Sequence, residues 1–511
     1  MSSYAQPSAV ARGETEFSLT WGQQVFRHLN NLFGDYTLPK LDQIAIPDLE
    51  WSTEPSWGLI SFRESLLLHT ANCNPRRNYC KGAENCSCIY RKFHNYFGNL
   101  VSPVWWTFLW MNEGFATLYE KYIVDSINGP PDQYELFMIT TKDEVMSLDV
   151  NGALVPLNHY VESPSEINDK AYDVIVTHYK AAFVLFMART MLQQITFEKG
   201  VRYYLAERAF NSATPDDLHS GLQRSYDEDN PGNGVDIADI MWPWQNIRGY
   251  PVVTVTIEGD VLTLKQEGFR TPHDELYGIP ISIATASNPN FSYPLQQIYW
   301  MTSKEMQISL SDPTIGWVEN DWIVVNVRNF AYYVTNYDDN LWNLLIEELV
   351  NEPENIHFEN RGALFANFHL FIEHAHDVSS TIFLRLAELL QVENEVTVWR
   401  RADRGLLRIG SRLRGTELFQ GHETYLRNLF APIYERMLND EHFNTQLVDL
   451  VRFWSCTSGI QECLDSAIDE LYDTTCRVVT VPWIYNSKCN GPGILLEHCT
   501  DGPIKCRSVI E

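Results

Sequence analysis

The spacing of apolar residues changes twice along the chain. Between Val25 and Phe33 apolar side chains recur every three or four residues, which predicts a helix. Between Val253 and Ile257 they alternate with threonines, which is typical of a strand. From Leu341 to Leu349 the helical spacing returns. These changes predict a mixed first part, a strand-rich middle and a helical last part.

The middle and last parts are each expected to form a domain. Runs of β-branched and aromatic residues predict further strands at 261–264, 281–284, 297–300, 322–327 and 332–334. Together they favour a small β-sandwich that acts as a spacer. Helical spacing continues at 360–375, 380–391, 395–408, 422–438 and 442–454, and helices joined by short loops favour an α-solenoid. The fold class is therefore α+β and multidomain.

The composition excludes some classes of function. The chain has 511 residues, of which 45% are hydrophobic, as expected for a packed globular protein. Its net charge of −28 leaves no basic stripe for the phosphates of nucleic acid. No run of eighteen apolar residues occurs, so we expect no transmembrane segment. The N-terminus lacks a basic start followed by an apolar core, so we expect no signal peptide.

The cysteines indicate an oxidising compartment. They fall into two groups, Cys73, Cys80, Cys86 and Cys88, and then Cys456, Cys463, Cys476, Cys489, Cys499 and Cys506. An even number in tight groups favours disulfides, although the first group could instead bind zinc. Glycosylation sequons begin at Asn85 and Asn290 and fit secretion. Because no signal peptide is expected, we interpret the chain as an incomplete piece of a longer secreted protein.

The most informative stretch is Tyr90-Arg91-Lys92-Phe93-His94-Asn95-Tyr96-Phe97-Gly98-Asn99-Leu100-Val101, followed by Asn112-Glu113-Gly114-Phe115-Ala116. Eighteen residues separate His94 from Glu113. The two segments resemble the active-site helices of the zinc aminopeptidases, the gluzincin family with its aminopeptidase N-like, insect-type members. In that family the first helix reads His-Glu-x-x-His-x-x-Phe-Gly-Asn-Leu-Val, and a second Glu follows at the same distance.

The resemblance implies a zinc site that has lost its chemistry here. In the family two His and a Glu hold the metal, and the Glu beside the first His takes a proton from bound water. Tyr90 replaces the first His, and a phenol that ionises near pH ~10 is a poor zinc ligand. Arg91 replaces the catalytic Glu and cannot act as a base. With only His94 and Glu113 left as remnant ligands, we expect zinc to be absent or weakly bound.

The strand that binds substrate in the family is also changed. Trp57-Gly58-Leu59 matches the family, but Ser52-Thr53-Glu54-Pro55-Ser56 stands in front of it. Pro55 holds the position of a Glu that binds the α-amino group of the substrate, and it has neither a carboxylate nor an N–H. Glu54 is one residue away, so it is expected to face the other side of the strand.

Residues 172–180 resemble the segment whose Tyr stabilises the oxyanion of the reaction. Counting back from Lys180 places His178 at that position, whereas counting forward from Asp173 places Thr177 there. Tyr179 is one or two residues out of register. Because one residue turns a helix by about 100°, we expect Tyr179 to point elsewhere and to pack as an ordinary tyrosine.

The resemblance covers roughly residues 4–490 and implies three domains. A degenerate thermolysin-like peptidase domain is expected at 1–248, a β-sandwich at 249–336 and an incomplete helical superhelix at 337–511. The family's β-rich N-terminal domain is expected to be missing. The family also implies a disulfide between Cys456 and Cys463, and the pairing of the other cysteines stays open. His374 and His376 are interpreted as surface or packed residues, not ligands.

Three hypotheses for function follow. The first is a catalytically inactive homologue, extracellular or at the cell surface, that binds peptides or proteins and in which Arg91 pairs with Glu113. The second is an active or weakly active zinc aminopeptidase with unusual ligands. The third is a truncated product without a stable function.

Overall fold

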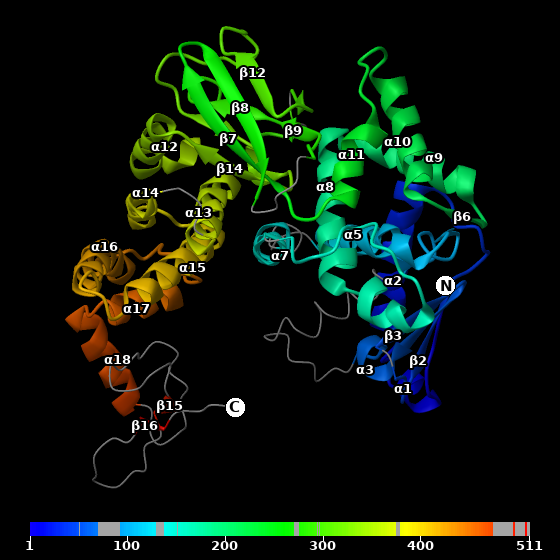
Figure 1. Cartoon of the computed structure of the whole chain (residues 1–511). Coiled ribbons are helices and arrows are strands. Elements are labelled where there is room, and N and C mark those ends of the chain that lie inside the picture. Colours follow the sequence, from blue (N-terminus) through cyan, green and yellow to red (C-terminus); the bar gives the residue numbers. More distant parts are fainter. Residues whose placement is uncertain are drawn as a thin grey trace. The chain divides into compact units, whose positions relative to one another are not determined.

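The computed structural model describes most of the chain. It covers residues 1–50, 52–69, 92–128, 137–150, 152–269, 275–293, 295, 297–374 and 379–473, and the short strands β15 (Ile494–Leu495) and β16 (Cys506–Arg507). The chain forms two compact units, shown in Figure 1 and described separately. The first holds residues 1–317 and 324–338, and the second holds residues 318–323 and 339–511.

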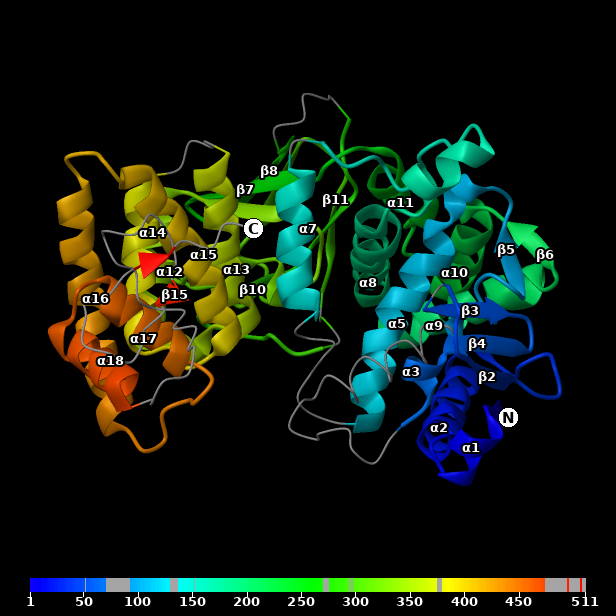
Figure 2. The ribbon, with the colours of Figure 1, turned by 90° about the horizontal axis from the view of Figure 1, so that it is seen from below.

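Helices dominate the first 250 residues of the first unit. They are α1 (Pro7–Ala11), α2 (Glu16–Phe33), α3 (Glu64–Leu67), η1 (Trp106–Phe108), α5 (Trp110–Asn128), η2 (Phe137–Thr141), α7 (Lys142–Asp149), η3 (Pro164–Glu166), η4 (Ile167–Ala171), η5 (Val174–Lys180), α8 (Ala181–Met191), α9 (Gln194–Arg208), α10 (Pro215–Asp229) and α11 (Ile237–Asn246). Figure 2 shows α5 lying beside α8, which the contacts between these helices support.

Helix α2 is longer than the sequence predicts, but it uses the predicted face. It begins at Glu16, and Trp21, Val25, Leu29 and Phe33 form a buried stripe. The spacing of four residues keeps these side chains on one side of the helix. The helix ends where Gly34 adopts a φ of 96°, a conformation that favours glycine. Its buried stripe supplies one wall of the core around the candidate site.

The N-terminal part of the first unit also contains a four-stranded sheet. Its strands are β1 (Ser2–Tyr4), β2 (Asp42–Ile46), β3 (Thr53–Ser56) and β4 (Leu59–Arg63), in the order β1-β2-β4-β3. Strands β1, β2 and β4 are parallel, and β3 pairs antiparallel with β4 at the edge. A proline is tolerated at an edge, which fits Pro55 in β3. A separate parallel pair joins β5 (Val101–Pro103) to β6 (Asn211–Ala213).

The structure contains the strand-rich region that the sequence predicts in the middle of the chain. Its strands are β7 (Pro251–Glu258), β8 (Val261–Gly268), β9 (Ile279–Ile281), β10 (Ile283–Thr285), β11 (Tyr299–Met301), β12 (Glu305–Ser309), β13 (Ile323–Val325) and β14 (Val334–Tyr337). One sheet has the order β12-β8-β7-β14, and β10-β13 and β11-β9 form two pairs. The sequence did not predict β12, because its residues Glu-Met-Gln-Ile-Ser are largely polar.

His219 on α10 is buried against α11. Its Nε2 lies 2.8 Å from Nε2 of Gln245, so the neutral imidazole accepts a hydrogen bond from the amide. Burial lowers the pKa of His219 from 6.5 to about 4, although the charges of Asp216 and Asp236 oppose this shift. Protonation therefore costs free energy in the folded state.

We expect this histidine to make folding sensitive to acid. Because its pKa is lower in the folded state, its contribution is fully present above the unfolded pKa of about 6.5 and is lost as the pH falls toward 4. The shift corresponds to roughly 3 kcal/mol. The free energy of unfolding, measured by urea titration between pH 7 and pH 4, should fall less steeply for His219→Gln than for the native chain. Equal slopes would contradict this account.

The second unit is helical. Its helices are α12 (Asp339–Asn351), η7 (Pro353–Asn355), α13 (Phe358–Glu373), α14 (Ser380–Leu386), η8 (Ala387–Gln391), α15 (Val396–Leu413), α16 (Phe419–Asn439), α17 (Val448–Thr457) and α18 (Gln461–Asp473). The sequence predicted most of them to within a few residues. It placed the start of α17 at residue 442, several residues too early, and it did not predict α18.

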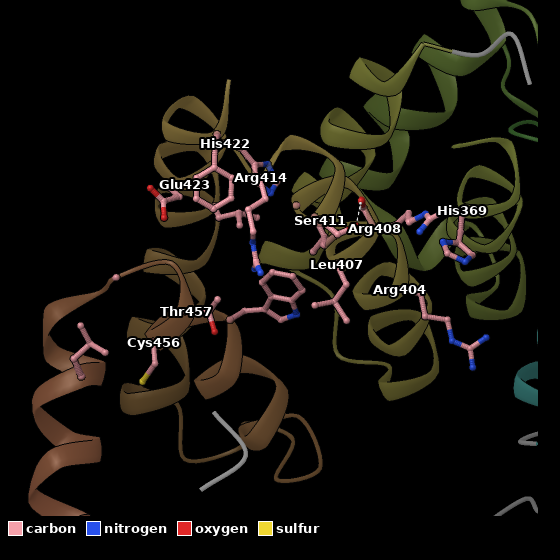
Figure 3. A pocket seen from close by; sticks show the side chains of 17 residues that line it. His369, Arg404, Leu407, Arg408, Ser411, Arg414, His422, Glu423, Cys456 and Thr457 are labelled. Carbon is pink, nitrogen blue, oxygen red and sulfur yellow. Dashed lines mark hydrogen bonds between the residues drawn. The ribbon is translucent and has the colours of Figure 1, made fainter. Parts of the chain in front are cut away.

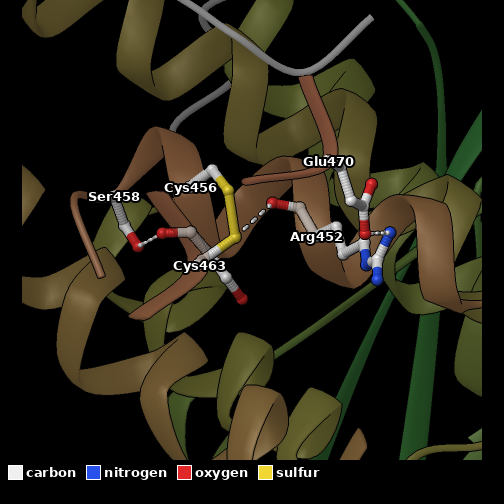
Figure 4. Close-up of a disulfide and its surroundings, with 6 residues drawn as sticks. Arg452, Cys456, Ser458, Cys463 and Glu470 are labelled. Atoms are coloured by element: carbon white, nitrogen blue, oxygen red, sulfur yellow. Dashed lines mark hydrogen bonds and ion pairs between the residues drawn. A yellow bond between two sulfur atoms is a disulfide. The ribbon is translucent and has the colours of Figure 1, made fainter. Parts of the chain in front are cut away.

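A disulfide closes the turn between α17 and α18. Cys456 and Cys463 are bonded, which confirms the predicted pair. Figure 4 shows the bridge beside Arg452, whose carbonyl lies 3.5 Å from Sγ of Cys463 and whose guanidinium pairs with Glu470 at 2.9 Å. The covalent loop holds the ends of the two helices together.

Among the described residues, no single helix is long and apolar enough to cross a membrane. The bent pair 164–171 and 174–191 meets the length and composition criteria only when its two helices are taken together.

Candidate active site

The aromatic core around His94 fixes its position. Phe93 and Phe97 stack with ring centroids 5.5 Å apart, and Phe33 meets both rings edge-on. The imidazole of His94 is buried, with Nδ1 3.2 Å from the carbonyl oxygen of Phe97. A carbonyl can only accept, so Nδ1 carries a hydrogen and donates it. This bond leaves Nε2 of His94 directed at Glu113.

Glu113 approaches His94 from α5. The packing of α5 on α8 is close because residue 114 is glycine: a Cβ there would stand 2.6 Å from Cβ of Ala181. Oε2 of Glu113 lies 3.3 Å from Nε2 of His94, and both side chains are 7% exposed. The two residues that the sequence singles out as remnant ligands are therefore in contact.

His178 reaches the same carboxylate from η5. Its Nε2 lies 3.4 Å from Oε2 of Glu113. Its Nδ1 lies 3.0 Å from Oγ1 of Thr177, and that hydroxyl donates to the carbonyl of Asp173 at 2.7 Å. The hydroxyl must then accept from Nδ1–H of His178. Both imidazoles thus present Nε2 to one carboxylate oxygen, and each contact is favourable when Nε2 is protonated or a cation lies nearby.

The π-helical hydrogen bonding of η5 explains why the sequence left the register of this segment open. A π-helix holds an extra residue per turn, so counts from the two ends disagree by one. His178 occupies the position that faces Glu113, and Thr177 is its hydrogen-bond partner. Tyr179 instead packs on Phe137, with ring centroids 5.8 Å apart. The sequence marked His178 only as a replaced position and did not predict its contact with Glu113.

Strand β3 carries Pro55, at the position of the family's amine anchor, and its neighbour Glu54. Pro55 lies opposite Ile60 of β4, and Glu54 lies opposite Ser61. Residues directly opposite in an antiparallel pair share a face, so Pro55 lies on the face of buried Ile60 and Glu54 on the other, exposed face. Glu54 therefore does not replace a carboxylate at position 55.

Several predicted residues lie outside the described ones. These are Tyr90, Arg91, His376, the sequon at Asn85, and Cys73, Cys80, Cys86, Cys88, Cys476, Cys489 and Cys499. Of Cys506 only the backbone, in β16, is described. The proposed pair of Arg91 and Glu113 thus stays a prediction. His374 is described and caps the C-terminal end of α13.

Comparison with known proteins identifies the relationship. Residues 17–244 match the profile of the peptidase family M1 domain, and residues 322–475 match that of the ERAP1-like C-terminal domain. The chain belongs to the M1 family of zinc aminopeptidases. The first profile spans β2, β3 and β4 of the sheet, α5 and η5, and so includes His94, Glu113 and His178.

Individual M1 relatives are similar over most of this chain. Bovine aminopeptidase N is 28% identical over 84% of the chain and 45% of its own length. Chicken aminopeptidase Ey is 28% identical over 90% of the chain and 48% of its own length. The rat thyrotropin-releasing hormone-degrading ectoenzyme is 27% identical over 85% and 41%. The chain thus spans about half the length of the curated relatives it matches.

The zinc that the M1 family implies does not fit the described side chains. Structural and catalytic zinc sites need at least three protein ligands around one point. In the part of the chain that the structure describes, no group of three or more His, Cys, Asp or Glu residues is arranged to hold a metal ion. Of the family's ligand positions, His94 and Glu113 are described, and the third side chain beside them, His178, contacts the same oxygen of Glu113. We therefore derive no step of chemistry through a metal.

Proposed function

We propose that this chain is a catalytically inactive M1 homologue that keeps the aminopeptidase scaffold as a binding protein. The observation that carries the proposal is the cluster of His94, Glu113 and His178. In this cluster the carboxylate that holds zinc in the family is shared by two imidazoles. A residue that replaces the oxyanion tyrosine has thus become a partner of a metal-ligand position.

The other replacements support the same proposal. Arg91 has no basic site that could take a proton from water at neutral pH. Pro55 offers no carboxylate to an amino group, and Tyr179 packs on Phe137 instead of facing Glu113. In the family these positions supply the base, the anchor of the substrate's amino group and the oxyanion donor, so the loss of all three is not repaired by one change.

The proposal also includes the division of the chain into domains, the class of ligand and the location of the protein. We propose a thermolysin-like domain at 1–248, a β-sandwich at 249–336 and part of a helical solenoid at 337–511. We also propose that peptides or protein segments are the ligands and that the protein acts outside the cell or at its surface. The disulfide and the name of an ectoenzyme among the relatives support this location.

An active zinc aminopeptidase is the second candidate, because one observation favours it. Hydrogen bonds fix Nδ1 of both His94 and His178, and metal-binding histidines are commonly oriented in this way. In this alternative His178 is the third ligand that position 90 no longer supplies.

Turnover of N-terminal residues separates the two candidates. We expect the native chain with added zinc to release no more product from alanyl, leucyl and arginyl amides than Glu113→Ala does under the same conditions. Turnover that is abolished by chelator, and that is absent from Glu113→Ala, would contradict the proposal. Both proteins should first be shown to melt cooperatively, so that misfolding does not explain a missing activity.

A further inference from the structure

The helical unit holds a cavity that the M1 chemistry does not use. It lies between α15, α16 and α17 and has a volume of about 940 Å³. Pockets of a few hundred to about 1,000 Å³ are typical of sites for small molecules. Figure 3 shows side chains from these helices around it, with Cys456 and Thr457 at one side and His369 at the other. The cavity is therefore large enough for an organic ligand.

One wall of the cavity is apolar. Leu406, Leu426 and Trp454 line it, and their side chains are almost entirely buried. The indole of Trp454 is held in place, because Nε1 donates to Oδ1 of Asp403 at 2.8 Å and the ring of Phe430 stacks on it with centroids 5.5 Å apart. Since burial of apolar surface is favourable, this wall can bind the apolar body of a ligand.

His422, on α16, places an unsatisfied polar side chain on the lining. It is only 6% exposed, and neither ring nitrogen has a hydrogen-bond partner among the described residues. Burial lowers the pKa of His422 below its usual 6.5, although the charge of Glu423 opposes this shift. The neutral imidazole has one nitrogen that donates and one that accepts. A buried nitrogen without a partner costs free energy, so a ligand group that bonds to it is stabilising.

Gly410 of α15 leaves space for such a group beside His422. A Cβ at this position would lie 3.3 Å from Nε2 and 3.9 Å from Cδ2 of the imidazole. Outside the neighbouring residues of α15, it would meet no other described atom within 4 Å. A ligand oxygen close to this point is within hydrogen-bond reach of Nε2.

The charged side chains on the lining are already engaged. Arg408 pairs with Glu373 at 3.5 Å. Arg404 and Arg414 also have interactions of their own, and Glu423 adds a negative charge to the same lining. An ionic ligand would lose its hydration on entering the cavity without meeting an unengaged counter-charge, and that loss is costly. The lining therefore favours a ligand without charge.

We propose that this cavity binds an uncharged apolar molecule that carries a hydroxyl group. The apolar body lies on Leu406, Leu426 and Trp454, and the hydroxyl bonds to Nε2 of His422 in the space beside Gly410. A hydroxyl both donates and accepts, so it satisfies Nε2 in either tautomer of the neutral ring. A hydrocarbon would leave the imidazole unsatisfied, and a carboxylate could bond only to a nitrogen that carries a hydrogen.

Equilibrium dialysis of the full chain at neutral pH against naphthol, naphthalene and naphthoate tests this site. The three probes share one apolar body, which carries a neutral hydroxyl, no polar group or an anion. We expect naphthol to bind with a Kd on the order of 100 µM, and the other two to bind at least about tenfold more weakly. A tenfold difference is the size expected for one hydrogen bond to a buried nitrogen.

Three variants locate the hydroxyl. His422→Phe keeps an aromatic ring without its nitrogens and should bind naphthol no more tightly than naphthalene. Gly410→Ala should weaken naphthol by about tenfold, because its Cβ occupies the space beside Nε2. Gly421→Ala is the matched control on α16, since an added Cβ there has no described atom within 4 Å, and it should leave the affinity unchanged.

The melting temperature of each variant shows whether it is folded. His422→Phe should melt no lower than the native chain, because it removes buried nitrogens that lack partners. The proposal is overturned if the folded native chain does not bind naphthol, if naphthalene or naphthoate binds as tightly, or if His422→Phe keeps the preference for naphthol. Equal naphthol affinities of Gly410→Ala and Gly421→Ala would also contradict it. None of these readouts depends on zinc or on peptidase activity.

Discussion

Replacing Tyr90 by His and Arg91 by Glu is expected to give this chain about one firmly bound zinc ion. The change restores the family's two histidines at i and i+4, a spacing that in a helix places both side chains on one face, where they can bind one metal together with Glu113. It also replaces a permanent cation, which repels a divalent ion, by the carboxylate that the family has at this position. Zinc content of the purified double variant, measured by mass spectrometry after dialysis, provides the test.

Activity of the double variant is expected to stay weak. Pro55 still offers no carboxylate to the substrate's amino group, and Tyr179 packs on Phe137. Loss of one oxyanion donor alone costs about 10²–10³ in kcat. Tyr90→His with Arg91→Gln is the matched control, because it restores the ligand and removes the cation without supplying a base. A folded double variant that binds no zinc would contradict our interpretation of positions 90 and 91.

Lys180→Met is expected to lower the free energy of unfolding by about 3–5 kcal/mol. Nζ of Lys180 lies 2.7 Å from Oδ2 of Asp149, and the two side chains are 1% and 0% exposed. The hydroxyl of Tyr332 also donates to this oxygen, at 3.2 Å. Removing the lysine leaves a buried carboxylate without its counter-ion, which is the main cost.

Urea unfolding of matched variants separates burial from charge. Lys170→Met removes an exposed lysine whose partner, Glu166, lies 2.8 Å away one helical turn earlier, and it should hardly move the midpoint. Lys180→Met combined with Asp149→Leu should recover part of the loss, because no buried charge is then left alone. Equal midpoints for Lys180→Met and Lys170→Met would show that the buried pair does not stabilise the unit.

The sequence predicted the elements best where one face of each is buried. The stripe of α2 and most helices of the second unit were found, because helical spacing is visible without knowing their partners. Strand β12 and helix α18 were missed. The strand alternates weakly, and the helix follows a short turn after Cys456.

The candidate site was predicted only as far as residue types and spacing allow. His94 and Glu113 could be paired because their spacing matches a known motif. The contact of His178 with Glu113 could not be predicted, since it depends on the π-helical turns of η5 and on the close packing at Gly114. The disulfide between Cys456 and Cys463 was predicted from the resemblance to the family, and it is confirmed.

The zinc content of the native chain, compared with Glu113→Ala and His178→Ala, tests our central claim most directly. We predict that the native chain, purified without chelator and exposed to zinc, holds no more metal than Glu113→Ala does. The contrary result is about one zinc ion per native chain, lost in both variants. That outcome would make His178 the third ligand and would show that the M1 site has been rebuilt, not abandoned.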